Sequence, residues 1–178
     1  TEIKVENGVL LINVERKPEN PNKSIWAKID DIKINQTMKV YVSMKSITEL
    51  QVNGSGKILS ENSIASDYLT LGVAGSGTMD VDIKGNTVKA ELSGSGNLIL
   101  RGYATSIDAN LSGSGNLKGY ECPLETGKVR VSGSGSAEVN VTSSLEAYVL
   151  GSGNVKHKGN TKTLTKKVYG SGAVDRVY

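Results

Sequence analysis

The stretch Leu92-Ser93-Gly94-Ser95-Gly96-Asn97-Leu98 decides the fold, because its Gly-Ser-Gly core recurs along the chain. The tripeptide occurs seven times, and the gaps between successive central serines are 21, 19, 19, 20, 18 and 19 residues. Self-similarity at such a period indicates a protein built from stacked repeats. The central serines are Ser55, Ser76, Ser95, Ser114, Ser134, Ser152 and Ser171.

Apolar and polar residues alternate on both sides of each tripeptide. Three residues before the serine every repeat has Val or Leu, and three residues after it every repeat has an apolar residue. This period of two indicates β-strands with one face turned inward. About 19 residues cannot bury an apolar face alone, whereas coils stacked at the ordinary strand spacing of about 4.8 Å can. We therefore expect a core that includes Leu92, Leu98, Leu111, Leu117 and Val131.

These patterns predict an all-β fold, a single-stranded parallel β-helix with coils of about 19 residues marked by Gly-Ser-Gly turns. Turn-forming pairs such as Gly85-Asn86 and Gly159-Asn160 mark the opposite corners of the coils. A left-handed helix usually keeps strict hexapeptide repeats. Because the coil length varies here, we favour a right-handed helix.

At 178 residues, the chain is predicted to form one β-helix domain over residues 1–178. Residues 1–53 lack the tripeptide, and we expect irregular N-terminal coils that cap the stack, with Trp26 covering the core. Residues 54–172 hold the phased repeats, and residues 173–178 form the C-terminal end.

Charge and composition narrow the function classes. The formal net charge of +3 is too small to indicate a nucleic-acid partner, and no apolar run reaches the length of a membrane span. Cys122 is the only cysteine, which excludes an internal disulfide. The chain begins at Thr1 without a signal peptide, as expected of a mature or trimmed chain.

The last coil is basic. Between residues 154 and 178, five lysines and Arg176 stand against one acid, Asp175. One interpretation is a surface that meets phosphates or acidic sugars. The interpretation that we favour is an open sheet edge protected by lysines, since Lys166 occupies a column otherwise filled mainly by Leu, Val and Ala.

Candidate catalytic groups do not converge in this pattern. Asp80 and Asp82 share an outward strand face, but the same offsets in the next coil are Ile99 and Arg101, so we expect an Asp82–Arg101 surface ion pair. His157, the only histidine, is expected to be a solvated or partly packed residue of the last coil. We predict no catalytic residue, no metal site and no cofactor.

The repeats resemble a known family. Ile47-Thr48-Glu49-Leu50-Gln51-Val52-Asn53-Gly54-Ser55-Gly56 and the unit Leu111-Ser112-Gly113-Ser114-Gly115-Asn116-Leu117 are similar to the head GIN domain of auto-transporter adhesins. The resemblance implies a secreted protein or lipoprotein of the bacterial cell envelope, located in the periplasm, on the outer membrane or at the cell surface. It also implies an adhesion or binding module without defined catalytic residues.

The second hypothesis from the residues is a binding surface for an extracellular glycan or cell-surface polymer. Outward tyrosine rings could stack on sugars and an asparagine ladder could donate hydrogen bonds; alternatively, both sets only stabilise the surface. A pectinase-type enzyme and a purely structural spacer remain the competing function classes. The sequence does not define an oligomeric state. The candidate ligand-binding residues are Tyr120, Tyr148, Tyr169, Asn97, Asn116 and Asn154.

Overall fold

The computed structural model describes residues 2–14 and 38–178. Contacts between Cα atoms divide the chain into two compact units, Thr1–Val42 and Ser43–Tyr178. All regular elements of the described residues are β-strands, which confirms the predicted all-β class.

The first unit contains an antiparallel hairpin of β1 (Glu2–Glu6) and β2 (Val9–Asn13). Asn7 and Gly8 join the strands with φ angles of 52° and 78°, as a two-residue hairpin turn with positive φ at both positions requires. The sequence predicted irregular coils in this region, and residues 2–13 pair as a hairpin instead. Trp26 lies outside the described residues, so its capping role and the single-domain organisation stay predictions.

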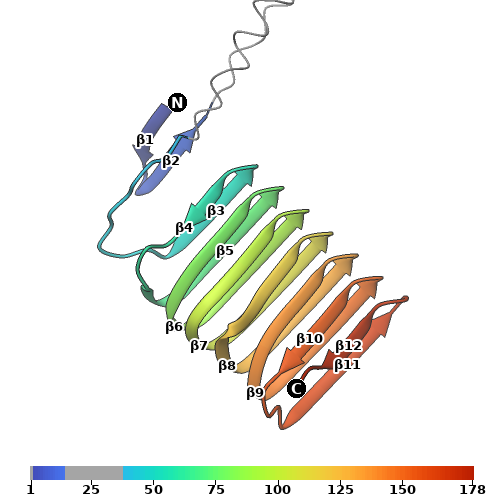
Figure 1. Ribbon diagram of the computed structural model, residues 1–178. Helices are drawn as coiled ribbons and strands as arrows, with labels where there is room; N and C mark the ends of the chain where they lie inside the picture. Colours follow the sequence, from blue (N-terminus) through green and yellow to red (C-terminus); the bar gives the residue numbers. More distant parts are fainter. Residues whose placement is uncertain (1, 15–37) are drawn as a thin grey trace, which may run out of the picture. The chain divides into compact units, whose positions relative to one another are not determined.

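The second unit is a parallel β-solenoid of about seven turns, with coils of about 19 residues (Figure 1). In the central coils one long strand runs from each Gly-Ser-Gly turn around the opposite corner to the next turn. The strands are β3 (Glu49–Gly54), β4 (Lys57–Leu59), β5 (Ile64–Gly75), β6 (Thr78–Gly94), β7 (Asn97–Gly113), β8 (Asn116–Gly133), β9 (Ser136–Gly151), β10 (Asn154–Lys158), β11 (Thr163–Tyr169) and β12 (Ala173–Arg176). The right-handed sense stays a prediction.

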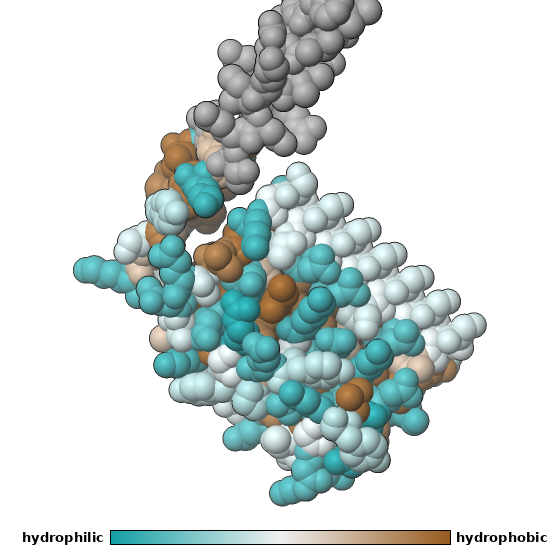
Figure 2. All heavy atoms as spheres, in the orientation of Figure 1, coloured by the Kyte–Doolittle hydropathy of each residue, from teal (hydrophilic) through white to brown (hydrophobic). Residues whose placement is uncertain are grey.

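The tripeptides stack in one column, as their phasing predicts. Gly94 of β6 pairs in register with Gly113 of β7, and the amide of Ser114 donates a hydrogen bond of 2.8 Å to the carbonyl of Gly94. The same bond recurs between Ser95 and Gly75 at 2.9 Å. Figure 2 shows the column as pale ridges along one edge of the solenoid. Every coil therefore makes this turn at the same position around the solenoid.

The core lies between the two strand layers of each coil. The inward residues Leu92, Leu98, Leu111, Leu117 and Val131 are all buried, which confirms the alternation read from the sequence. The differences in length between coils are accommodated outside the Gly-Ser-Gly turns.

The coil of β8 absorbs its extra length in a β-bulge. The register with β7 shifts between Ile99 and Arg101, and the register with β9 shifts between Gly119 and Pro123. Cys122 of this bulge remains buried within the core.

One strand layer of the stack ends on β11, which pairs with β9, and the other ends on β12, which pairs with β10. The three inward positions of β11, Leu164, Lys166 and Val168, are all exposed, because no further coil of the described chain covers them. Lys166 stands in register with the buried Ala147. A charged side chain at this place disfavours pairing of the open edge with another strand.

Candidate binding surface

The solenoid presents two outward strand faces, separated by the column of turns. The pre-turn face consists of outward side chains in segments that end at a turn, such as Asp108, Asn110 and Ser112 of β7. The post-turn face consists of those in segments that follow a turn, such as Asn97 and Arg101 of the same strand. Because the register is continuous, equivalent residues of successive coils form rows across each face.

The asparagine ladder lies on the post-turn face. The Asn116 amide nitrogen donates to the Asn97 side-chain oxygen at 3.1 Å, and the side-chain oxygen of Asn154 accepts the amide of Ala173 at 3.1 Å. All three asparagine side chains are half-buried. Their polar groups are therefore engaged in holding coil to coil, which favours the stabilising role over ligand binding for these three residues.

Tyr120 also comes from the post-turn side, in the bulge of β8. The Lys158 ammonium lies 5.2 Å from the centre of its ring. Partial burial raises the pKa of the Tyr120 hydroxyl, and the charge of Glu138 raises it further. Tyr120 and Glu138, together with Arg101 and Lys118, line a shallow hollow beside the bulge.

The two aspartates near this hollow are held by local partners. Arg101 forms its ion pair with Asp80, at 2.6 Å, and not with Asp82, the partner that the sequence predicted. Asp82 accepts a hydrogen bond from Ser63 instead, and its amide donates to the Ser60 hydroxyl at 2.8 Å. Within residues 2–14 and 38–178, no group of three His, Cys, Asp or Glu side chains is placed to hold a metal ion.

His157 is buried in the last coil, more deeply than the sequence indicated. Its side chain is 3% exposed, and the Thr161 hydroxyl lies 3.3 Å from its Nδ1. Burial lowers the pKa of the imidazole, and the nearby charges of Arg176 and Lys166 lower it further. The neutral ring acts here as part of the core.

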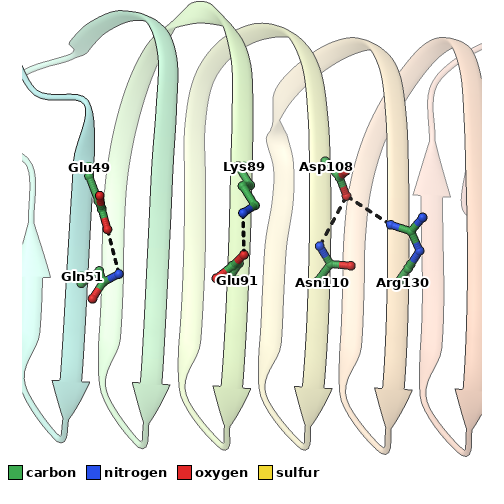
Figure 3. A network of polar contacts seen from close by, with 7 residues as sticks. All are labelled: Glu49, Gln51, Lys89, Glu91, Asp108, Asn110 and Arg130. Atoms are coloured by element: carbon green, nitrogen blue, oxygen red, sulfur yellow. Dashed lines mark hydrogen bonds and ion pairs between the residues drawn. The ribbon is translucent and has the colours of Figure 1, made fainter.

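The pre-turn face carries a network of polar pairs (Figure 3). Most pairs join positions two residues apart on one strand, where both side chains point outward. They include Glu49 with Gln51 at 2.8 Å and Lys89 with Glu91 at 2.8 Å. These exposed pairs contribute little to stability, but they keep the surface polar.

A different group of side chains occupies the C-terminal part of the pre-turn face. Tyr148 of β9 stands in register between Arg130 of β8 and Lys167 of β11. The Arg130 guanidinium carbon lies 5.5 Å from the Tyr148 ring centre, and the Lys167 ammonium lies 5.9 Å from it. In the next row, Leu150 stands in register with Tyr169. Two cations and two exposed apolar side chains therefore lie side by side.

The six candidate residues thus fall on two faces. Tyr148 and Tyr169 lie together on the pre-turn face, whereas Tyr120 and the three asparagines belong to the post-turn side. The sequence interpretation missed Arg130, Lys167 and Leu150 as neighbours of these tyrosines. Their offsets from the repeat serine carried that signal, because Arg130, Tyr148 and Lys167 all stand four residues before it.

These features define a class: an extended parallel β-solenoid with polar, row-ordered outer faces. The chain belongs to the family described as "Putative auto-transporter adhesin, head GIN domain", whose model matches residues 1–161. No curated protein matches the chain. The structure contains no helix, among its described residues, of the length and apolarity that a membrane crossing requires.

Solved structures of similar fold come from bacteria. A "putative adhesin" from Bacteroides fragilis NCTC 9343 superposes with a TM-score of 0.83 at 20% identity, covering 99% of this chain and 76% of that one. A "putative adhesin" from Parabacteroides distasonis ATCC 8503 has a TM-score of 0.71 at 28% identity, covering 74% of this chain and 56% of that one. A third, from Parabacteroides merdae ATCC 43184, has a TM-score of 0.64 at 23% identity, covering 74% and 64%.

Proposed function

We propose that this chain is a non-enzymatic binding module of the bacterial cell envelope that recognises an extended glycan or similar surface polymer. The observation that carries the proposal is the continuous register, which repeats outward side chains at the strand spacing along both faces. Extended surfaces of this kind are how solenoid proteins commonly bind their ligands. Membership of an adhesin family and the bacterial relatives support the envelope location.

The competing enzyme hypothesis requires acidic or basic groups that converge on a reacting atom. Asp80, the least exposed carboxylate among the described ion pairs, is neutralised by Arg101 at 2.6 Å. His157 is buried among core side chains, with Thr161 as its hydrogen-bond partner. These environments favour structural roles for both residues.

The test is to apply the purified chain to an array of neutral and acidic polysaccharides and to measure polymer cleavage in parallel. We expect selective retention of at least one polysaccharide class without release of new sugar ends. Asp80→Asn and His157→Gln, checked for folding by circular dichroism, should retain that binding. Cleavage that disappears in either variant would establish the enzyme, and absence of any binding would favour the spacer.

A further inference from the structure

We infer that the C-terminal part of the pre-turn face binds acidic polysaccharides. The site, called the Tyr148 patch below, consists of Arg130, Tyr148, Leu150, Lys167 and Tyr169. Carboxylates of the polymer bind the two cations, and an adjoining sugar ring packs on Leu150 and Tyr169. The inference rests on the proposed function and specifies the ligand class and the place where it binds.

The register of three strands builds the patch as two adjacent rows. In one row Arg130, Tyr148 and Lys167 stand on β8, β9 and β11; in the other, Leu150 and Tyr169 stand on β9 and β11. Ser132 of β8 completes the second row beside Leu150. Since the serine side chain is short, the apolar pair is accessible from that side.

Tyr148 positions the two cations. Its neighbours on both adjacent strands are positively charged, and each lies within cation–π distance of the ring, at 5.5 Å for Arg130 and 5.9 Å for Lys167. The tyrosine hydroxyl donates to Glu146 at 3.3 Å, which fixes the side chain at its other end. The faces of the Tyr148 ring are therefore occupied, so its role is to orient cations and not to stack on a sugar.

The charge around the patch is favourable for an anion. Two acids lie nearby: Asp108, whose carboxylate is 3.6 Å from Arg130, and Glu146, which accepts from Tyr148. Lys167 forms no ion pair with any described residue of the chain. Lys128, in register with Glu146, adds a further positive charge to the same side. At least one cation is thus available to a ligand carboxylate.

The apolar row explains why a sugar polymer suits the patch. Leu150 is 51% exposed and Tyr169 is 63% exposed, and the two are neighbours on adjacent strands. A pyranose ring offers an apolar C–H face to such side chains, and the tyrosine hydroxyl can bond to its hydroxyl groups. Arg130 and Lys167 are separated by two strand spacings, or about 9.6 Å. A polymer with a carboxylate on each sugar can reach both.

The experiment compares polygalacturonate with its methyl-esterified form, which has the same backbone without the charges. Binding to the full chain is measured by titration calorimetry. We expect polygalacturonate to bind, and the esterified polymer to bind at least about tenfold more weakly, since hydrogen bonds to charged groups are lost. The double variant Arg130→Gln/Lys167→Gln should lose affinity for polygalacturonate by a similar factor.

A matched control removes the same charge from the other face. Lys118→Gln/Lys156→Gln changes two exposed lysines at equivalent positions of the post-turn face and should bind like the parent. Tyr169→Ala should weaken binding, and circular dichroism should show that all variants keep the fold. An equal loss in both double variants, or equal binding of the two polymers, would overturn the inference.

Two further probes separate other polyanions from the proposed ligand. Polyglutamate and vesicles that contain phosphatidylglycerol should bind more weakly than polygalacturonate, because they lack the sugar ring that packs on the apolar row. Tighter binding of either probe would overturn the inference. If no acidic polysaccharide binds but a neutral one does, the inference fails and the proposed function stands; if no polysaccharide binds, both fail.

Discussion

Replacing Gly113 with alanine tests how closely the coils are stacked at the turns. Gly113 has a φ of 113°, and a Cβ atom built on it would lie 2.5 Å from the carbonyl oxygen of Gly94 in the preceding coil. That carbonyl accepts the Ser114 amide at 2.8 Å, so it cannot retreat without loss of an inter-coil hydrogen bond. The positive φ costs alanine roughly 1–2 kcal/mol, and the close contact adds about 1–3 kcal/mol.

Gly54 provides the matched control, because it occupies the same position in the first turn. Its φ is 98°, but a Cβ atom added to Gly54 would have nothing within 4 Å. Gly54→Ala should therefore show the backbone strain alone, roughly 1–2 kcal/mol. Urea unfolding followed by circular dichroism gives both changes in the free energy of unfolding. Equal effects of the two substitutions would refute the explanation from coil contact.

Three further experiments test the core. Replacing Leu111, which is 3% exposed, with alanine should lower the free energy of unfolding by about 2–5 kcal/mol, as measured by denaturant unfolding. A neutral result would mean that the alternation is one residue out of phase. The lowered pKa of His157 means that the unfolded chain binds a proton more readily than the folded chain does. The free energy of unfolding should therefore have its full value above pH 6.5 and decrease as the pH is lowered below 6.5. His157→Gln should remove that part of the pH dependence in thermal melts, and an unchanged profile would assign it to other groups. Burial raises the pKa of the Cys122 thiol to about 11, so a thiol reagent such as Ellman's should react only with unfolded chain; rapid reaction of the native protein would show that the bulge of β8 is open.

The fold follows from the sequence because the repeat carries its own register. The phased tripeptides predict which residues align between coils, and the alternation predicts that Leu98 and Leu117 point inward, as they do. The sequence interpretation did not identify the hairpin around Asn7-Gly8 as a separate sheet, although an Asn-Gly pair between two alternating runs is a strong hairpin signal.

The candidate surface was less accessible to sequence reasoning. Chemical type suggested grouping Tyr120 with Tyr148, but their offsets from the repeat serine place them on different faces. The register also does not predict which side chains form a pair. Arg101 aligns with Asp82, yet it pairs with Asp80, because Ser63 binds Asp82. Asn97 and Asn116, in contrast, align in register and their side-chain amides bond to each other.

An NMR titration of the isotope-labelled chain with oligogalacturonate tests directly whether the Tyr148 patch is a non-enzymatic binding site. Binding at the Tyr148 patch predicts that the shifted backbone amides cluster at residues 130–132, 148–150 and 167–169, and that the oligosaccharide is recovered intact. Shifts centred on Asn97 and Asn116, or cleavage of the oligosaccharide, would contradict the assignment of a non-enzymatic binding surface to the pre-turn face.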